Sequence, residues 1–153
     1  MNADDMIYMG SRLIFMVGLP RAGKSTAIRR IREITPNAVV VSKDSIRLAL
    51  HGQPFIDEKE PEVHTIWKAM IKALLYSGHR HIILDGCFHN ESRRKSVERL
   101  FPDAQFQTYY VPTSPDVCRQ RAIDCGQDYL LPVIDRMESE ADKTLKVYWA
   151  NTD

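Results

Sequence analysis

The stretch Gly18-Leu19-Pro20-Arg21-Ala22-Gly23-Lys24-Ser25 fits the pattern G-x-x-x-x-G-K-[ST]. Its two glycines let the backbone wrap closely around an anion, with N–H groups pointing inward. In this pattern the lysine reaches the β- and γ-phosphates of a nucleotide, and the hydroxyl of Ser25 is a ligand for Mg²⁺. We therefore expect residues 18–26, with Thr26 as the last, to bind the phosphates of ATP or another nucleoside triphosphate. Lys24 is also expected to act in catalysis.

The segments on either side of this loop have different hydrophobic patterns. Before it, residues 13–17 form a continuous apolar run, which predicts a strand buried on both faces. After it, residues 24–34 carry apolar side chains at helical spacing, which predicts a helix whose positive dipole end faces the loop. A strand, a glycine-rich turn and a helix are the context that the motif requires.

The alternation of strand and helix continues along the chain. Strands are predicted over 38–41, 81–85 and 104–111, and helices over 44–50, about 58–77, 91–100, from 114–116 onward and from about 132 onward. Residues 147–149 fit either a short edge strand or a packed tail. This order predicts an α/β fold with a parallel sheet and helices on both faces. Ligands of such sheets bind at the carboxyl ends of the strands.

The composition is that of a globular protein with one domain. The 153 residues predict a single domain over 1–153, with its core over about 13–143 and a tail over 144–153. Apolar residues make up 44% and charged residues 27%, which excludes disorder as the main description. A net charge of +1 excludes nucleic-acid binding through bulk charge and leaves local basic patches.

Membrane insertion and secretion are not expected. No apolar run reaches the length that spans a bilayer, and residues 1–10 carry two aspartates and no basic residue, unlike a signal peptide. The three cysteines form no C-x-x-C pair. We therefore predict a cytoplasmic protein with reduced thiols.

Asp44 and Arg47 follow the second predicted strand, three residues apart, and share one face of a short helix. Beside a phosphate loop, Asp44 can accept the proton of an attacking hydroxyl. Arg47 can hold an acceptor phosphate or a developing charge. The same residues also fit an ordinary helix start, with Ser42 or Asp44 as N-cap and Arg47 in solvent. The spacing leaves both interpretations open.

Asp85 ends the third apolar strand. Beside a phosphate loop, such an aspartate supports Mg²⁺ through water. The alternative is a strand-ending turn made by Asp85 and Gly86. We favour the metal role because the strand is apolar and the phosphate loop is already present.

Arginines follow the fourth strand. Arg119 and Arg121 fall on one predicted helix and Arg136 on the next, with a polar loop at Gly126 between them. A helix–loop–helix with arginines can close over a nucleotide, exclude water and stabilise the charge of the γ-phosphate. Because Arg119 and Arg121 are two residues apart, they point in different directions, and at most one is expected to be catalytic.

Together these residues resemble the small P-loop kinases related to polynucleotide 5′-hydroxyl kinase. The resemblance covers about residues 13–143 and rests on residues 18–26, 42–47, 83–85, Asn90, Arg93-Arg94 and 131–137. It implies a P-loop NTPase fold with a central five-stranded parallel sheet, helices on both faces and a helical lid. It also implies a site for ATP and Mg²⁺, with Asp44 as base, Arg47 near the acceptor and a lid arginine. We assign Arg121 to catalysis, Arg119 to the nucleotide, and Ser25 with Asp85 to the metal.

Two departures from the family pattern concern the acceptor. The stretch from Asp85 to Asn90 is longer than the Asp-x-x-Asn or Asp-x-Asn of the family, and Cys125 precedes Gly126 where polynucleotide kinases carry an arginine. The chain also carries no phosphatase domain, so we do not expect a bifunctional end-healing enzyme.

We predict a Mg²⁺-ATP-dependent kinase that transfers the γ-phosphate to a hydroxyl of nucleic acid. The acceptor is a polynucleotide 5′ end or, as in similar viral kinases, 5-hydroxymethyluracil in DNA; a viral enzyme would act in the host cytoplasm. One alternative is a small-molecule kinase acting on a nucleoside, an antibiotic or a sugar nucleotide. Another is an ATP-binding regulatory switch without an acceptor.

Overall fold

The structure is a computed structural model that describes residues 11–52 and 55–151. The prediction that residues 1–10 are no signal peptide lies outside these ranges. The strands are β1 (Arg12–Val17), β2 (Val39–Ser42), β3 (His81–Asp85) and β4 (Gln105–Tyr110). The helices are α2 (Lys24–Ile34), α3 (Lys43–His51), α4 (Glu60–Tyr76), α5 (Glu91–Leu100), α6 (Pro115–Asp124), α7 (Leu131–Glu140) and α8 (Lys143–Ala150), with short 3₁₀ turns η1 (Asp57–Lys59) and η2 (Asp128–Leu130).

The sheet is parallel throughout, with strand order β2-β3-β1-β4. The two central strands, β1 and β3, have the continuous apolar sequences that burial on both faces requires. Ser42 lies opposite Asp85 in the register, so β2 and β3 end side by side. The residues that follow these strands therefore meet at one edge of the sheet.

The expected fifth strand is not confirmed, because the described part of the chain contains a four-stranded sheet. Residues 147–149, predicted as an edge strand or a packed tail, belong to helix α8. Asp142 starts this helix by accepting a hydrogen bond from the N–H of Leu145 at 2.9 Å. The helix then packs through the buried Leu145 and through Tyr148, whose ring lies 5.4 Å from that of Tyr110 in β4.

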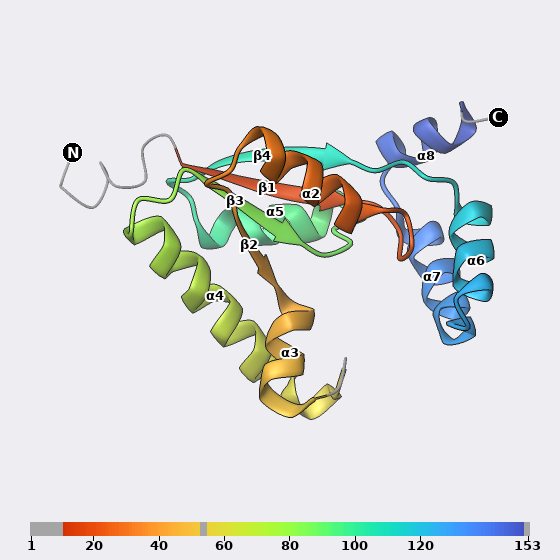
Figure 1. Cartoon of the computed structure of the whole chain (residues 1–153), viewed down its shortest axis with the longest axis horizontal. Helices are drawn as coiled ribbons and strands as arrows, with labels where there is room; N and C mark the ends of the chain where they lie inside the picture. Colours follow the sequence, from red (N-terminus) through yellow and green to blue (C-terminus); the bar gives the residue numbers. More distant parts are fainter. Residues whose placement is uncertain (1–10, 53–54, 152–153) are drawn as a thin grey trace.

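Helices cover both faces of the sheet, as predicted (Figure 1). Leu13, Phe15 and Val17 face one side, where they join a core that includes Trp67 of α4. Ile14 and Met16 face the other side and pack with Ile28 of α2, among others. No helix in the described ranges has the length and apolarity needed to cross a membrane.

Helices α6 and α7 lie together beyond the carboxyl end of β1, where a lid was predicted (Figure 1). They pack on the phosphate loop through a separate apolar cluster. Its members are Leu19 and Ala22 of the loop, Cys118 and Ala122 of α6, and Ile134 of α7. Helices α6 and α7 are therefore attached to the phosphate loop by buried side chains.

Candidate functional site

The phosphate loop connects β1 to α2 by a tight backbone path. A Cβ added to Gly18 would lie 2.8 Å from the carbonyl oxygen of Val111, so a side chain there would push the loop off the end of β4. Gly23 has a φ of 102°, in the region that favours glycine. Both glycines are thus required by the geometry of the turn.

The N-terminus of α2 is open. Its N-cap Gly23 offers no side-chain acceptor and its first turn holds no acidic residue. Helices α3, α5, α6 and α8 differ, because each begins at a side chain that accepts a backbone N–H: Ser42, Asn90, Ser114 and Asp142. The N–H groups of the first turn of α2 have no partner within the helix, and with the helix dipole they favour an anion.

The charged side chains next to this helix end come from α2 and β3. Nζ of Lys24 donates to the carbonyl oxygens of Gly18 at 3.0 Å and Leu19 at 2.8 Å. Burial raises the pKa of the Asp85 carboxyl, the nearby Lys24 lowers it, and the charge of Asp44 raises it. These three predicted site residues therefore share one electrostatic neighbourhood at the carboxyl ends of the strands.

The residues around the loop suit a nucleotide with Mg²⁺. The described residues contain no group of three or more His, Cys, Asp and Glu that could hold a metal on its own. Mg²⁺ in nucleotide sites needs few protein ligands, because it binds substrate phosphates, waters and one or two protein oxygens. The exposed Ser25 and the half-buried Asp85 provide oxygens of this kind. The donor set therefore fits the expected group.

Asp44 lies beside an arginine that is held by a second carboxylate. Nη1 of Arg47 donates to Oδ1 of Asp44 at 2.7 Å, and Nε lies 3.1 and 3.0 Å from the two carboxylate oxygens of Glu60, which also pairs with Nη2. The Asp44 side chain is 80% exposed, whereas that of Arg47 is 15% exposed. These bonds raise the pKa of Arg47, chiefly through Glu60, and lower the pKa of Glu60.

The start of α3 agrees with one part of the ordinary helix-start interpretation and disagrees with the other. Ser42 is the N-cap, because its hydroxyl accepts the N–H of Ser45 at 3.3 Å, so the carboxylate of Asp44 is not the cap. Arg47 is not in solvent but bridges α3 to Glu60 at the start of α4. Glu60 was not predicted, since no motif connects it to a residue 13 positions earlier.

The two arginines of α6 have different surroundings. Nη1 of Arg121 donates to the carbonyl oxygen of Arg21 at 3.1 Å and lies near Gly23. The guanidinium of Arg119 instead pairs with Asp116 in α6 and with Asp135 and Glu138 in α7, a set that joins the two lid helices. The structure thus brings Arg121 to the phosphate loop and does not bring Arg119 there.

The loop after β3 is tied to the junction of α7 and α8. The buried His89 lies 2.9 Å from Glu140 through Nε2, and burial lowers its pKa although Glu140 opposes this. Arg94 donates to the carbonyl oxygen of Phe88 at 2.7 Å and pairs with Asp142. The loop that follows Asp85 is therefore connected to the junction of α7 and α8.

Residues 13–124 match the protein family described as AAA domain. The chain belongs to this family. No curated protein matches the sequence. The α/β fold and the phosphate loop are those of a P-loop kinase-like domain.

Solved structures share this fold. One is a chain of the Pnkp1/Rnl/Hen1 RNA repair complex, with a TM-score of 0.68, 17% identity, and coverage of 86% of this chain and 46% of that chain. APS kinase CysC of Mycobacterium tuberculosis in complex with AMPPNP and APS has a TM-score of 0.59, 18% identity, and coverage of 73% and 68%. A gluconokinase from Sinorhizobium meliloti 1021 has a TM-score of 0.55, 18% identity, and coverage of 89% and 77%.

At these identities the likeness establishes the fold. The present chain spans less than half the length of the matched chains of the Pnkp1/Rnl/Hen1 complexes, at 38% and 46%.

Proposed function

We propose that the protein is a Mg²⁺-ATP-dependent phosphotransferase that acts on a hydroxyl of nucleic acid, in DNA or at a polynucleotide 5′ end. The observation that carries the proposal is that β2 and β3 end side by side, with Asp44 just past Ser42 and with Asp85 opposite Ser42. Asp85 also senses the charges of Asp44 and of Lys24, the first residue of the uncapped helix α2. This arrangement offers an anion site, a cation, a carboxylate suited to Mg²⁺ and a second carboxylate suited to a proton.

The roles follow from these positions. Backbone N–H groups of the phosphate loop and Lys24 hold the β- and γ-phosphates, and Arg121 of the lid supplies a further positive charge. Ser25 and Asp85 would hold Mg²⁺, which neutralises charge on the phosphates when bound. Asp44 takes the proton of the acceptor hydroxyl, whose oxygen forms the new bond to the γ-phosphorus while the bond to the β-phosphate oxygen breaks and ADP leaves. Arg47 orients Asp44 through their 2.7 Å hydrogen bond.

Positive charge beside Asp44 supports a polyanionic acceptor. Burial lowers the pKa of Lys43, Arg47 lowers it further, Glu60 raises it, and Arg93 adds to the lowering. Arg47 and Arg93 thus lie close enough to Lys43 to lower its pKa, and Arg47 is itself paired with Asp44 and Glu60. A hydroxymethylated base inside a duplex would have to flip out to reach Asp44.

A small-molecule acceptor is the second candidate. The structures of the APS kinase and the gluconokinase share the fold, and both are named for small acceptors. An ATP-dependent switch without an acceptor is the third candidate. It predicts hydrolysis without transfer and nucleotide-dependent association with a partner.

A panel of acceptors with γ-labelled ATP and Mg²⁺ tests the proposal. It contains DNA and RNA oligonucleotides with a 5′ hydroxyl, DNA with 5-hydroxymethyluracil, nucleosides, sugar nucleotides and an aminoglycoside. We expect label on an oligonucleotide. Label on a small molecule alone would replace the nucleic-acid acceptor, and hydrolysis with no labelled acceptor would favour the switch.

A further inference from the structure

Arg21 of the phosphate loop has an unusual backbone conformation. Its φ is 68°, in the left-handed region that glycine adopts freely and that residues with a Cβ adopt only at an energetic cost. In the described ranges, Phe88 is the one other non-glycine residue with a positive φ. Glycine would make the same turn more easily, so the strain at Arg21 points to a role for its side chain.

Both ends of Arg21 contact helix α6. Its carbonyl oxygen accepts a hydrogen bond from Nη1 of Arg121 at 3.1 Å, and its own Nη2 donates to Sγ of Cys125 at 3.1 Å. A thiol is a weak acceptor, and this contact uses one of the five N–H donors of the guanidinium. Cys125 can therefore fix the direction of the Arg21 side chain while most of its donors stay open to a ligand.

The charge of Arg21 is not neutralised by a carboxylate. Within residues 11–52 and 55–151, no ion pair includes Arg21 or Arg121, whereas Arg119 on the same helix pairs with three carboxylates. The two guanidinium groups at the phosphate loop thus differ from the one that joins α6 to α7. An anion bound at the loop would supply the missing negative charge.

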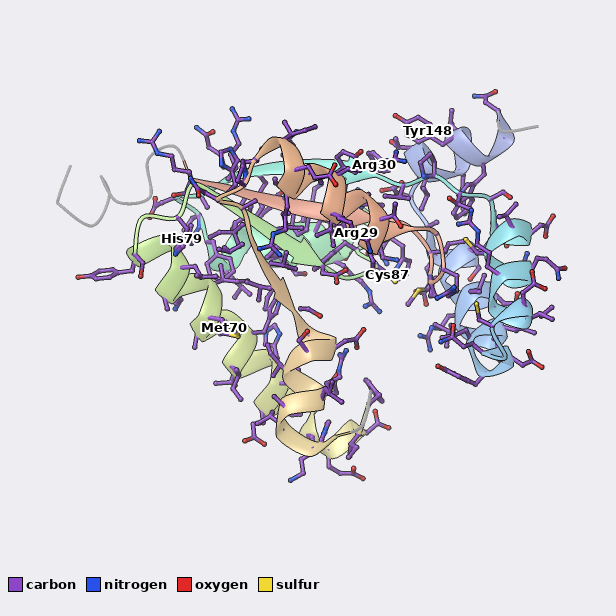
Figure 2. The ribbon with its side chains drawn as sticks, viewed as in Figure 1. Arg29, Arg30, Met70, His79, Cys87 and Tyr148 are labelled. Carbon is purple, nitrogen blue, oxygen red and sulfur yellow. The ribbon has the colours of Figure 1, made fainter. Side chains whose placement is uncertain are left out.

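Lys24 and Arg21 place positive charge on two sides of the phosphate loop. Nζ of Lys24 lies 3.5 Å from Sγ of Cys87, in the segment that follows β3 (Figure 2). Arg21 is instead held at Cys125, at the end of α6. A triphosphate at the uncapped N-terminus of α2 would therefore meet Lys24 from one side and Arg21 from the other.

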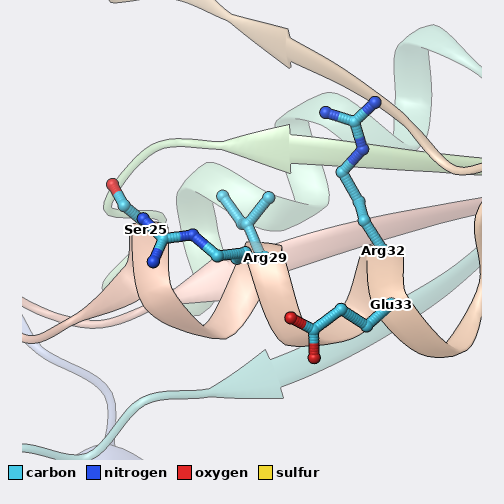
Figure 3. Close-up of a pocket in the computed structure, with 5 residues that line it drawn as sticks. Ser25, Arg29, Arg32 and Glu33 are labelled. Carbon is cyan, nitrogen blue, oxygen red and sulfur yellow. The ribbon is translucent and has the colours of Figure 1, made fainter.

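Exposure alone does not distinguish Arg21. Other exposed arginines lie on α2, where Arg29 and Arg32 line an open pocket that also includes Ser25 (Figure 3) and Arg30 projects from the same helix (Figure 2). These three arginines belong to a regular helix. Arg21 differs from them because it lies in the loop itself, has a left-handed backbone and contacts α6 at both ends.

We propose that Arg21 is a catalytic residue whose guanidinium binds the γ-phosphate of ATP, together with that of Arg121. The inference rests on the proposed function and concerns the side chain of Arg21, whereas the rest of the loop binds through backbone N–H groups. A planar guanidinium can donate to two oxygens of one phosphate. During transfer the acceptor oxygen bonds to the γ-phosphorus and the bond to the β-phosphate oxygen breaks, and Arg21 stabilises the negative charge on the phosphate oxygens.

The affinities of Arg21 variants for ATP and ADP test this role without an acceptor. Arg21→Gly removes the guanidinium and relieves the backbone strain, so we expect the variant to fold. Arg21→Lys keeps the positive charge but lacks the planar fork. The matched control is Arg30→Ala, which removes an exposed arginine from α2. Displacement of a fluorescent nucleotide gives the affinities, and thermal unfolding checks the fold.

We expect Arg21→Gly to bind ATP about tenfold more weakly and ADP within about twofold of the wild type, because a charged hydrogen bond to the γ-phosphate is lost. Its melting temperature should equal or exceed that of the wild type, and transfer to the acceptor should fall about 100-fold. Arg21→Lys should lie between Arg21→Gly and the wild type, and Arg30→Ala should behave like the wild type.

An Arg21→Gly variant that binds ATP as well as the wild type, or that loses equal affinity for ATP and ADP, would overturn the contact with the γ-phosphate. A loss of ATP affinity as large in Arg30→Ala would overturn it as well. A loss confined to ATP in Arg21→Gly, in a protein that labels no acceptor, would keep Arg21 at the γ-phosphate and reject the proposed function instead.

Discussion

The two halves of the proposed site are built differently. On the nucleotide side, the phosphates would meet mainly backbone groups: the uncapped end of α2 and the glycine loop, with Lys24 bonded to two loop carbonyls. On the acceptor side, the proposed site consists of side chains, with Arg47 held between Asp44 and Glu60 across two helices. A local motif is enough to build the first half, whereas the second depends on tertiary packing. Substitutions should therefore separate nucleotide binding from transfer.

Lys24→Ala should have the largest effect, because it removes a cation next to the phosphates. We expect transfer of the γ-phosphate to fall at least about 1000-fold, with weaker ATP binding. Labelled transfer and binding of a fluorescent ATP analogue measure the two effects, with Lys72→Ala as an exposed control lysine. Transfer by Lys24→Ala within tenfold of the wild type would contradict the assignment of this half of the site.

The arginines of α6 provide a matched pair. Arg121→Ala should reduce transfer about 100-fold, because its guanidinium lies at the phosphate loop, while Arg119→Ala should reduce it less than about threefold. Arg119→Ala should instead loosen the contact between α6 and α7, seen as faster proteolysis of the lid. A larger loss of transfer in Arg119→Ala than in Arg121→Ala would reverse the two roles.

Glu60→Gln tests whether the acceptor half depends on its ion pair. The amide cannot hold the guanidinium of Arg47 as a carboxylate does, so Asp44 loses its fixed partner. We expect kcat to fall about tenfold while the affinity for ATP stays the same. Glu62→Gln, an exposed neighbour on α4, is the control. If the affinity for ATP fell as much as kcat, the ion pair of Arg47 with Glu60 would also support nucleotide binding, and the two halves of the site would not act independently.

Asp85→Asn should have the smallest effect of these substitutions, a change in thermal stability that depends on pH. Burial raises the pKa of Asp85 above its usual 3.8, so the folded state binds the proton more tightly than the unfolded chain. As the pH rises from 3.8 through the raised pKa, Asp85 loses its proton and the folded state becomes less stable relative to the unfolded chain. The amide in Asp85→Asn carries no charge, so this loss of stability does not occur in the variant. Thermal unfolding without nucleotide should show Asp85→Asn slightly more stable than the wild type at pH 7 to 8.

The stability difference should shrink as the buffer is acidified toward pH 3.8. The same variant should transfer phosphate at least about tenfold more slowly. A variant that is less stable than the wild type at every pH would show that the carboxylate has a structural role.

Local patterns predicted most of the fold. β3 and α5 have the predicted bounds, because a short apolar run and a local helix cap act over only a few residues. For residues 147–149 the edge strand was wrong, whereas the packed tail agrees with α8, because the N-cap at Asp142 starts a helix there. The ion pair of Arg47 with Glu60 and the different surroundings of Arg119 and Arg121 required the packing of helices distant in sequence.

The most direct measurement is phosphate transfer by Asp44→Asn together with its binding of ATP. Asparagine keeps the size of the side chain and removes the group that accepts the proton. We predict ATP binding within about twofold of the wild type and transfer reduced at least about 100-fold to the acceptor found in the panel. Transfer that stays within a few-fold of the wild type would contradict the role of Asp44 and, with it, the division of the site into two halves.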